Sequence, residues 1–348
     1  MKSLLPGLAL ALLPLAGAIA PPSPGEGGVP AETRSALDVR RDPTLRPLRR
    51  GSGPGSAAGR WSPERATFRV EVDGQRVLHR VMAVQTLPGR VVRVRLPDAP
   101  PTGLAFVHGA GTVRPTAGGW DWTAPAEPGV YAGRIDGAKG TTVALNLLVA
   151  HPATRVRDGS LFGYEIGAYA REPLRGSPDY LPPEGFVEVG RGDRDILVSP
   201  HFTLGQLLCK QPGEPRYISY SAPLVRKLEA VLEAVNEAGV AAPSLHVMSG
   251  FRTPAYNRAI GNRTVYSRHL WGDAADIFVD VDGDGDMDDL DGDGRSTLAD
   301  ARVLADIVEA VMARGEEGVR SGGLGLYRRN AAHGPFVHVD ARGYRARW

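Results

Sequence analysis

The sequence of 348 residues predicts an all-β sandwich followed by an α+β domain. Short alternations of apolar and polar residues, separated by Pro and Gly turns, run through residues 61–150 and are typical of half-buried strands. Apolar residues at helical spacing follow at 222–238 and 298–314, with short apolar runs between and after them. The second domain, at 196–348, is large enough to bury a core of its own.

Residues 1–20 predict a cleaved secretory signal peptide. Lys2 precedes an apolar stretch from Leu4 to Ala20 that is rich in Leu and Ala, and small residues end it. An uncleaved membrane anchor is the alternative. No other segment is long and apolar enough to cross a bilayer, so we expect a periplasmic or secreted protein.

Residues 21–60 predict a flexible linker, because they are rich in Pro, Gly, Ser and Arg and lack apolar periodicity. The arginines could contact anionic wall polymers or lipid head groups. A solvated tether is the simpler interpretation.

The strands of the sandwich are predicted from side chains that alternate toward a core. These are Phe68, Val70, Val72, Val92, Val94, Leu96, Val143, Leu145 and Leu147. The stretch Trp120–Tyr131 resembles the late strands of an immunoglobulin-like domain, without the disulfide of antibody domains. The resemblance implies an immunoglobulin-like β-sandwich at 61–150.

Residues 151–195 predict a bridging segment of strand and extended pieces that docks the two domains. The stretches 163–169 and 180–186 carry its aromatic side chains. These could line a glycan groove, but packing between the domains is the favoured interpretation.

The α+β domain is predicted to begin with a short helix around Cys209. A long helix from Ala222 to Ala238 follows, with Ser221 as N-cap and Gly239 as its stop. Next come a strand at 245–248, a strand ending at 277–279, a helix at 298–314 and a strand at 336–339. Helices with a small antiparallel sheet make this an α+β fold.

Net charge and cysteine content argue against nucleic-acid binding and against a cysteine nucleophile. The formal net charge of +2 gives no case for nucleic-acid binding. Cys209 is the single cysteine, so no internal disulfide forms, and its apolar surroundings indicate a buried thiol rather than a nucleophile.

His269, Asp276 and His338 predict a zinc site. Two imidazoles and a carboxylate are a common ligand set of catalytic zinc, which keeps a fourth position open for water. Gly272 and small residues between His269 and Asp276 allow a tight turn into a short strand. A second strand would carry His338, and we expect the two strands to be neighbours.

The motifs around these residues resemble a known family. Ser-Gly-Phe-Arg-Thr-Pro at 249–254, Ser267-x-His-x-x-Gly-x-Ala-x-Asp276 and the late His338 resemble the zinc D-alanyl-D-alanine carboxypeptidases, which are peptidoglycan peptidases. The resemblance covers about residues 196–348. It implies that His269, Asp276 and His338 are zinc ligands and that Arg252 binds the substrate carboxylate or the oxyanion. Arg252 could instead pair locally, and Ser267 could be a turn residue.

One departure from the family affects the chemistry. Family members place a Glu or His two or three residues before the last ligand, as general base or to steady the transition state, where this chain has Pro335 and Phe336. His333 and Asp340 are the candidate substitutes.

An acidic run at 280–300 predicts two overlapping calcium loops. The first begins at Asp280 and the second at Asp289, and Gly285 and Gly294 stand where such loops turn sharply. The predicted ligands are Asp280, Asp282, Asp284, Asp286, Asp288, Asp289, Asp291, Asp293, Thr297 and Asp300. The pattern resembles dockerin and thrombospondin-type loops, and it implies structural calcium at an insertion beside the zinc cleft.

The sequence therefore predicts an exported zinc metallopeptidase that cleaves peptidoglycan stem peptides or cross-links. A non-catalytic peptidoglycan-binding module that retains the zinc scaffold is the alternative. A third hypothesis is a calcium-stabilised adhesion protein. The cleaved bond, the base and the oligomeric state do not follow from the sequence.

Overall fold

The computed structural model describes residues 37–51, 61–98 and 103–348. The predicted signal peptide and most of the predicted linker lie outside these residues. Within them, no helix combines the length and the apolar character needed to cross a membrane.

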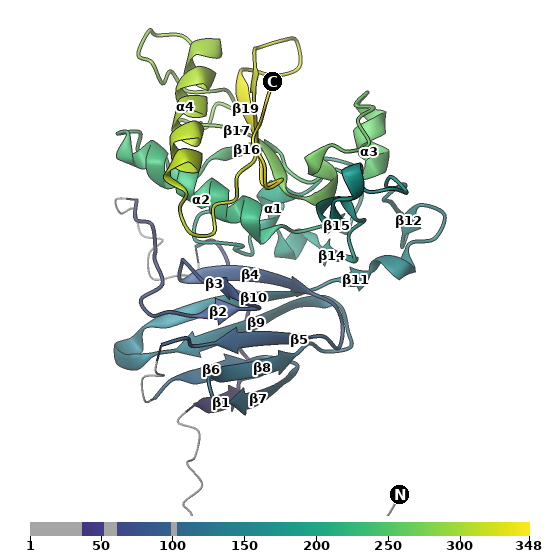
Figure 1. Ribbon diagram of the computed structural model, residues 1–348, viewed down its shortest axis with the longest axis vertical. Coiled ribbons are helices and arrows are strands. Elements are labelled where there is room, and N and C mark those ends of the chain that lie inside the picture. Colours follow the sequence, from purple (N-terminus) through teal and green to yellow (C-terminus); the bar gives the residue numbers. More distant parts are fainter. Residues whose placement is uncertain (1–36, 52–60, 99–102) are drawn as a thin grey trace, which may run out of the picture. The chain divides into compact units, whose positions relative to one another are not determined.

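Two five-stranded sheets form the sheet-rich N-terminal part (Figure 1). One sheet has the order β1 (Asp38–Arg41), β6 (Ala105–His108), β9 (Gly129–Asp136), β10 (Thr142–Val149) and β4 (Val81–Thr86). The other has the order β3 (Gln75–Arg76), β2 (Glu71–Val72), β5 (Val91–Arg95), β8 (Gly119–Thr123) and β7 (Thr112–Thr116). One apolar cluster joins side chains of both sheets, including Trp120, Trp122 and Phe106.

The core of this sandwich matches the alternation in the sequence. Eight of the nine side chains expected inside are buried, and Phe68 packs partly buried against the same cluster. On β5, Val92 and Val94 are buried while Arg93 is exposed. A period of two therefore predicted which face each strand turns inward.

The linker prediction is wrong for its described C-terminal part. Strand β1 pairs in parallel with β6, and Leu37 just before it is 5% exposed. Further along, the Leu48 backbone hydrogen bonds in both directions with the side chain of Asn146. The sequence did not reveal this edge strand, because it pairs through its backbone with a distant strand and its own residues are mostly charged.

The segment predicted as a bridge contributes strands to small sheets. Strands β11 (His151–Pro152), β14 (Gly185–Val189) and β15 (Arg216–Ile218) form one sheet, and β12 (Ser160–Leu161) and β13 (Tyr164–Glu165) form another. Tyr169 and Tyr180 pack edge-on against Trp271. Both tyrosines thus pack against the C-terminal part, and Tyr180 also lines the pocket described below.

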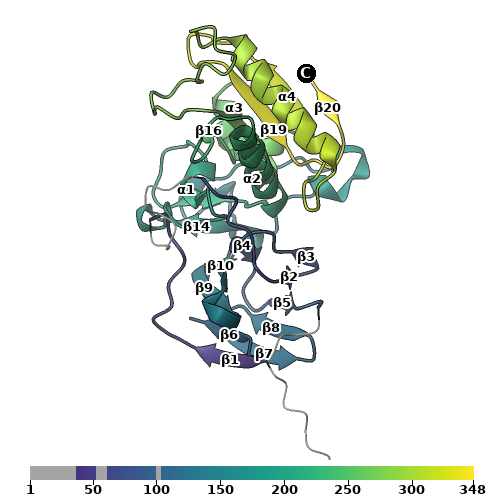
Figure 2. The ribbon, with the colours of Figure 1, turned by 90° about the vertical axis from the view of Figure 1, so that its left-hand side faces the viewer.

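The C-terminal part is a five-stranded sheet with helices packed on it (Figure 2). Its order is β16 (His246–Ser249), β17 (Ala274–Phe278), β19 (Phe336–Asp340), β18 (Gly323–Tyr327) and β20 (Ala346–Arg347). All pairs are antiparallel except β18 with β20. The helices are α1 (Leu204–Leu207), α2 (Ala222–Glu237), α3 (Pro254–Ala259) and α4 (Leu298–Arg314). The predicted mixture of helices with a mostly antiparallel sheet is confirmed.

The two long helices follow the local signals in the sequence. Helix α4 begins after Thr297, whose hydroxyl accepts from the Ala299 backbone, and it ends before Gly315 in a left-handed conformation. Helix α2 begins after Ser221, which occupies the N-cap position without a side-chain cap bond. Cys209 lies just beyond the short α1 and is fully buried, as expected.

Candidate metal centre and cleft

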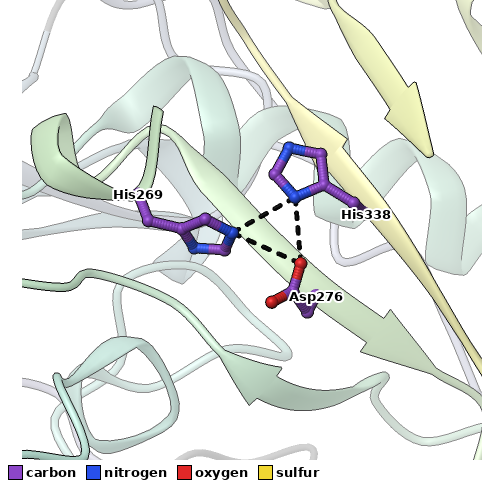
Figure 3. A group of neighbouring side chains, drawn as sticks. All are labelled: His269, Asp276 and His338. Atoms are coloured by element: carbon purple, nitrogen blue, oxygen red, sulfur yellow. Dashed lines mark hydrogen bonds and ion pairs between the residues drawn. The ribbon is translucent and has the colours of Figure 1, made fainter. Parts of the chain in front are cut away.

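His269, Asp276 and His338 converge on one point, from three elements (Figure 3). His269 lies in a short 3-10 helix, Arg268–Trp271, that leads into β17. Asp276 on β17 and His338 on β19 are directly opposite each other in the sheet. The expected neighbouring strands are therefore confirmed.

The ligand atoms of the three side chains face one another. His269 Nε2 lies 3.2 Å from His338 Nδ1 and 3.3 Å from Asp276 Oδ1, and His338 Nδ1 lies 2.9 Å from Asp276 Oδ1. All three residues are buried. One small cation would contact all three atoms.

Outer contacts decide which ring nitrogens carry protons. His269 Nδ1 lies 2.7 Å from the Gly250 carbonyl, which can only accept, so this nitrogen carries the proton. His338 Nε2 lies 3.3 Å from Asp340 Oδ2, which favours the proton there. When both rings are neutral, His269 Nε2 and His338 Nδ1 are then unprotonated. Each directs its lone pair toward the other nitrogen and toward Asp276. Three buried acceptors without a donor fit a metal ion.

The electrostatics of the cluster are dominated by burial and mutual pairing. Burial lowers the pKa of His269 below its ordinary value. Burial alone would raise the pKa of Asp276, but the two histidines hold it far below its usual range. For His338, burial lowers the pKa, but the neighbouring carboxylates of Asp276 and Asp340 outweigh burial and leave the pKa raised. The carboxylate therefore stays ionised, as a metal ligand must.

Gly272 explains part of the motif spacing. It ends the 3-10 helix with φ of 71°, and a Cβ built there would lie 1.8 Å from the Ser219 carbonyl oxygen. Only glycine tolerates both the left-handed backbone and this close approach. The turn from His269 into β17 depends on it.

Arg252 lies beside the cluster rather than apart from it. Its Nη2 donates to Asp276 Oδ2, and its Nε donates to Ser249 Oγ at 2.8 Å. The side chain is 13% exposed and lines the same pocket as His269. Ser267 precedes the 3-10 helix at its N-cap and also lines the pocket.

An open pocket of about 520 Å³ surrounds the cluster. Its walls are rich in aromatic side chains, namely Tyr180, Tyr266, Tyr327, Phe336 and Trp348. Polar groups of Asn262 and Thr264 and the guanidinium of Arg342 complete much of the remaining lining. The pocket therefore combines aromatic walls with polar groups beside the cluster.

Residues 200–289 match the family described as Peptidase M15. The matched range contains Arg252, His269 and Asp276, and His338 lies beyond it. The match supports a peptidase domain in this part of the chain. Searches of curated proteins and of solved structures find no match.

Neither predicted substitute base lines the pocket. Asp340 is 0% exposed and accepts hydrogen bonds from the Gly323 backbone and from Arg342, behind the His338 ring. His333 has one ring nitrogen against Asn330 and the other against the Gly334 carbonyl, and it does not line the pocket. The enclosed carboxylate of Asp340 is placed to orient His338, which disfavours it as a base.

Tyr327 and Trp348 were missed as site residues. Trp348 Nε1 donates to Tyr327 Oη at 2.7 Å, and the Trp348 ring lies 5.1 Å from the His338 ring. A Cβ at Gly325, opposite His338 in the sheet, would lie 2.5 Å from Trp348 Nε1. The alternating glycines of β18 were the available signal, since they leave room for this indole.

The acidic run forms two compact groups of carboxylates. One contains Asp280, Asp282 and Asp288, and the other contains Asp289, Asp291 and Asp300, each with ligand atoms within 4.8 Å of one another. Three other predicted aspartate ligands lie outside both groups, namely Asp284, Asp286 and Asp293. The two groups share no residue, and the two overlapping calcium loops stay a prediction.

Proposed function

We propose that this protein is a zinc metallopeptidase that hydrolyses peptidoglycan peptides. The observation that carries the proposal is the cluster of His269 Nε2, His338 Nδ1 and Asp276 Oδ1, three ligand atoms that lie within 3.3 Å of one another. Two histidines and one carboxylate suit zinc, with a fourth position open to the pocket. When bound, zinc supplies an acidified water and polarises the scissile carbonyl.

The protein's own groups would bind and orient the substrate. Arg252 lines the pocket, and among the described residues its Nη1 has no hydrogen-bond partner. A planar guanidinium suits the terminal carboxylate of a stem peptide. Asp340, from behind, holds the His338 ring in the orientation that directs Nδ1 at the metal position.

We assign to Tyr327 the role of stabilising the transition state, which a Glu or His usually has in the family. It lies directly opposite Phe336 in the sheet, next to the position where the family carries its base. Because Trp348 donates to its oxygen, the Tyr327 hydroxyl proton is free to donate into the pocket. A donor there would stabilise the developing oxyanion.

A binding module without turnover is the second candidate function. Among the pocket-lining residues, no imidazole or carboxylate is present besides the three of the cluster. A general base is therefore missing from the lining, which favours a protein that holds peptidoglycan peptides without cleaving them.

The proposal extends to the β-sandwich, which we assign to the immunoglobulin-like type. Strand order β2-β5-β8-β7 in one sheet and β6-β9-β10 in the other corresponds to the ABED and CFG arrangement. Tyr131 near the start of β9 donates to the Glu127 carbonyl at 2.8 Å, as the tyrosine corner of such domains does.

The remaining parts of the proposal concern location and the second metal. Export to the periplasm or beyond agrees with a peptidoglycan substrate and with the apolar segment at 1–20.

The acidic segment 280–300 would bind calcium in a structural role, because none of its carboxylates lines the pocket.

The test is digestion of purified muropeptides by the zinc-loaded chain, with products read by mass spectrometry. Loss of D-alanine or opening of a cross-link, absent after chelation and restored by zinc, is the expected result. Muropeptide binding by a folded, zinc-containing protein without any product would overturn the peptidase and establish the binding module.

A further inference from the structure

Asp280 is a buried carboxylate with one oxygen left unpaired. Its side chain is 6% exposed, and its Oδ1 is buried without a hydrogen-bond partner. Its Oδ2 lies 3.2 Å from Nδ1 of His246, which is 40% exposed. A bare, buried carboxylate oxygen is costly, and native proteins rarely leave one without a ligand or partner.

Two more carboxylates gather at the same place. Ligand atoms of Asp280, Asp282 and Asp288 all lie within 4.8 Å of one another. Asp288 is held there by its backbone, which donates to the Val279 carbonyl at 2.9 Å, and by its Oδ2, which accepts from the Val281 backbone. Among the described residues, His246 is the one basic side chain with a contact to these three carboxylates.

The segment between these carboxylates is joined to the edge of the cleft. Asp286 forms an ion pair with Arg329, in the loop 328–335 that connects β18 and β19. A Cβ at Gly334 in that loop would collide with the Asp286 carboxylate, so the two segments lie in close contact. The next residue, Met287, is 2% exposed within the core cluster that also contains Phe336 and Val337 of β19.

We infer that Asp280, Asp282 and Asp288 bind a divalent cation, and that this cation holds the loop 328–335 against the acidic segment. Three carboxylate oxygens suit a hard cation, and calcium accepts the irregular geometry of a loop more readily than magnesium does. The inference rests on the proposed function, which assigns calcium to the segment 280–300, and it adds the three ligands and the coupling to the loop 328–335.

Calcium titration of the chelator-stripped full chain, followed by calorimetry, tests the binding site. The variant Asp282→Asn removes an exposed ligand, and Asp306→Asn removes the same charge from an exposed position on α4. We expect Asp282→Asn to bind one calcium fewer than wild type and Asp306→Asn to match wild type. Calcium should raise Tm more in wild type than in Asp282→Asn.

Equal stoichiometry and equal Tm shifts in wild type and Asp282→Asn would overturn the site. Hydrogen exchange tests the coupling, since Asn330 and His333 close the loop 328–335 with a backbone hydrogen bond of 3.0 Å. Calcium removal should speed amide exchange in this loop in wild type. Unchanged exchange despite calcium release would overturn the coupling, and neither measurement depends on hydrolysis.

Discussion

The His269, Asp276 and His338 cluster and the acidic segment 280–300 both gather ligand atoms within 4.8 Å of one another, but they are built differently. The first cluster is buried, and its rings are oriented by groups that contact their far nitrogens. The second region lies largely in exposed backbone without regular structure, where many carboxylates accept only from nearby backbone amides.

This difference indicates that the His269, Asp276 and His338 cluster is preorganised for its metal ion, whereas the acidic segment is not. Strand pairing and outer hydrogen bonds hold the first cluster, so its metal should bind with little change in fold. Carboxylates in a loop repel one another until a cation neutralises them, so stability there should depend on the ion.

The largest expected effect comes from breaking the organised cluster. We expect His269→Ala to reduce muropeptide hydrolysis by more than about 100-fold, because one of three metal ligands is lost and outer-shell changes alone cost 10–100-fold. Zinc content measured after dialysis should fall in parallel. The melting temperature in calcium should change little, since the acidic segment is untouched. Full zinc content in this variant would contradict the assignment.

A positioning residue should give the next largest effect. Asp340→Asn weakens the hydrogen bond that orients His338, and we expect zinc affinity to fall by about 10–100-fold. Competition with a chromophoric chelator measures it. Asp179→Asn is the matched control, because it removes the same charge from the exposed Asp179–Arg320 ion pair. A purely structural role would lower Tm and leave zinc affinity intact.

Lys227 contacts Asp340, the residue that orients His338, and it should make the stability of the fold depend on pH. It is fully buried on α2, its ammonium donates to the Asp340 carbonyl, and burial lowers its pKa to about 8. Between pH 8 and the ordinary pKa of 10.5, the unfolded chain binds more protons than the folded one. The free energy of unfolding should therefore rise with pH there, by up to ~1.4 kcal/mol per unit.

Lys227→Met should remove this rise, as urea titrations across that pH range would reveal. An identical slope in the variant would show that other groups, rather than Lys227, cause the dependence.

The smallest expected effect is that of His333→Ala. Both ring nitrogens of His333 contact its own loop, and it does not line the pocket, so hydrolysis should stay within about two-fold of wild type. The initial rate on muropeptides measures it. A large loss of kcat with normal zinc content would restore His333 as a candidate base.

Much of the site was predictable because its signals are local. The turn through Gly272, the strand of Asp276 and the strand of His338 each follow from residues a few positions apart. Helix α4 begins and ends at the predicted residues, because its apolar spacing is also a local signal. Features that depend on distant partners, such as strand β1, were missed.

By itself, the sequence determined the chemistry that this protein carries: two imidazoles and a carboxylate at motif spacing, a run of carboxylates, and alternating strands. Only the tertiary structure decided which groups act together. It enclosed Asp340 behind His338, brought Trp348 to Tyr327, and left an oxygen of Asp280 unpaired. The physical reason is that residue type and spacing set local conformation, whereas burial and partners arise from contacts between segments far apart in the chain.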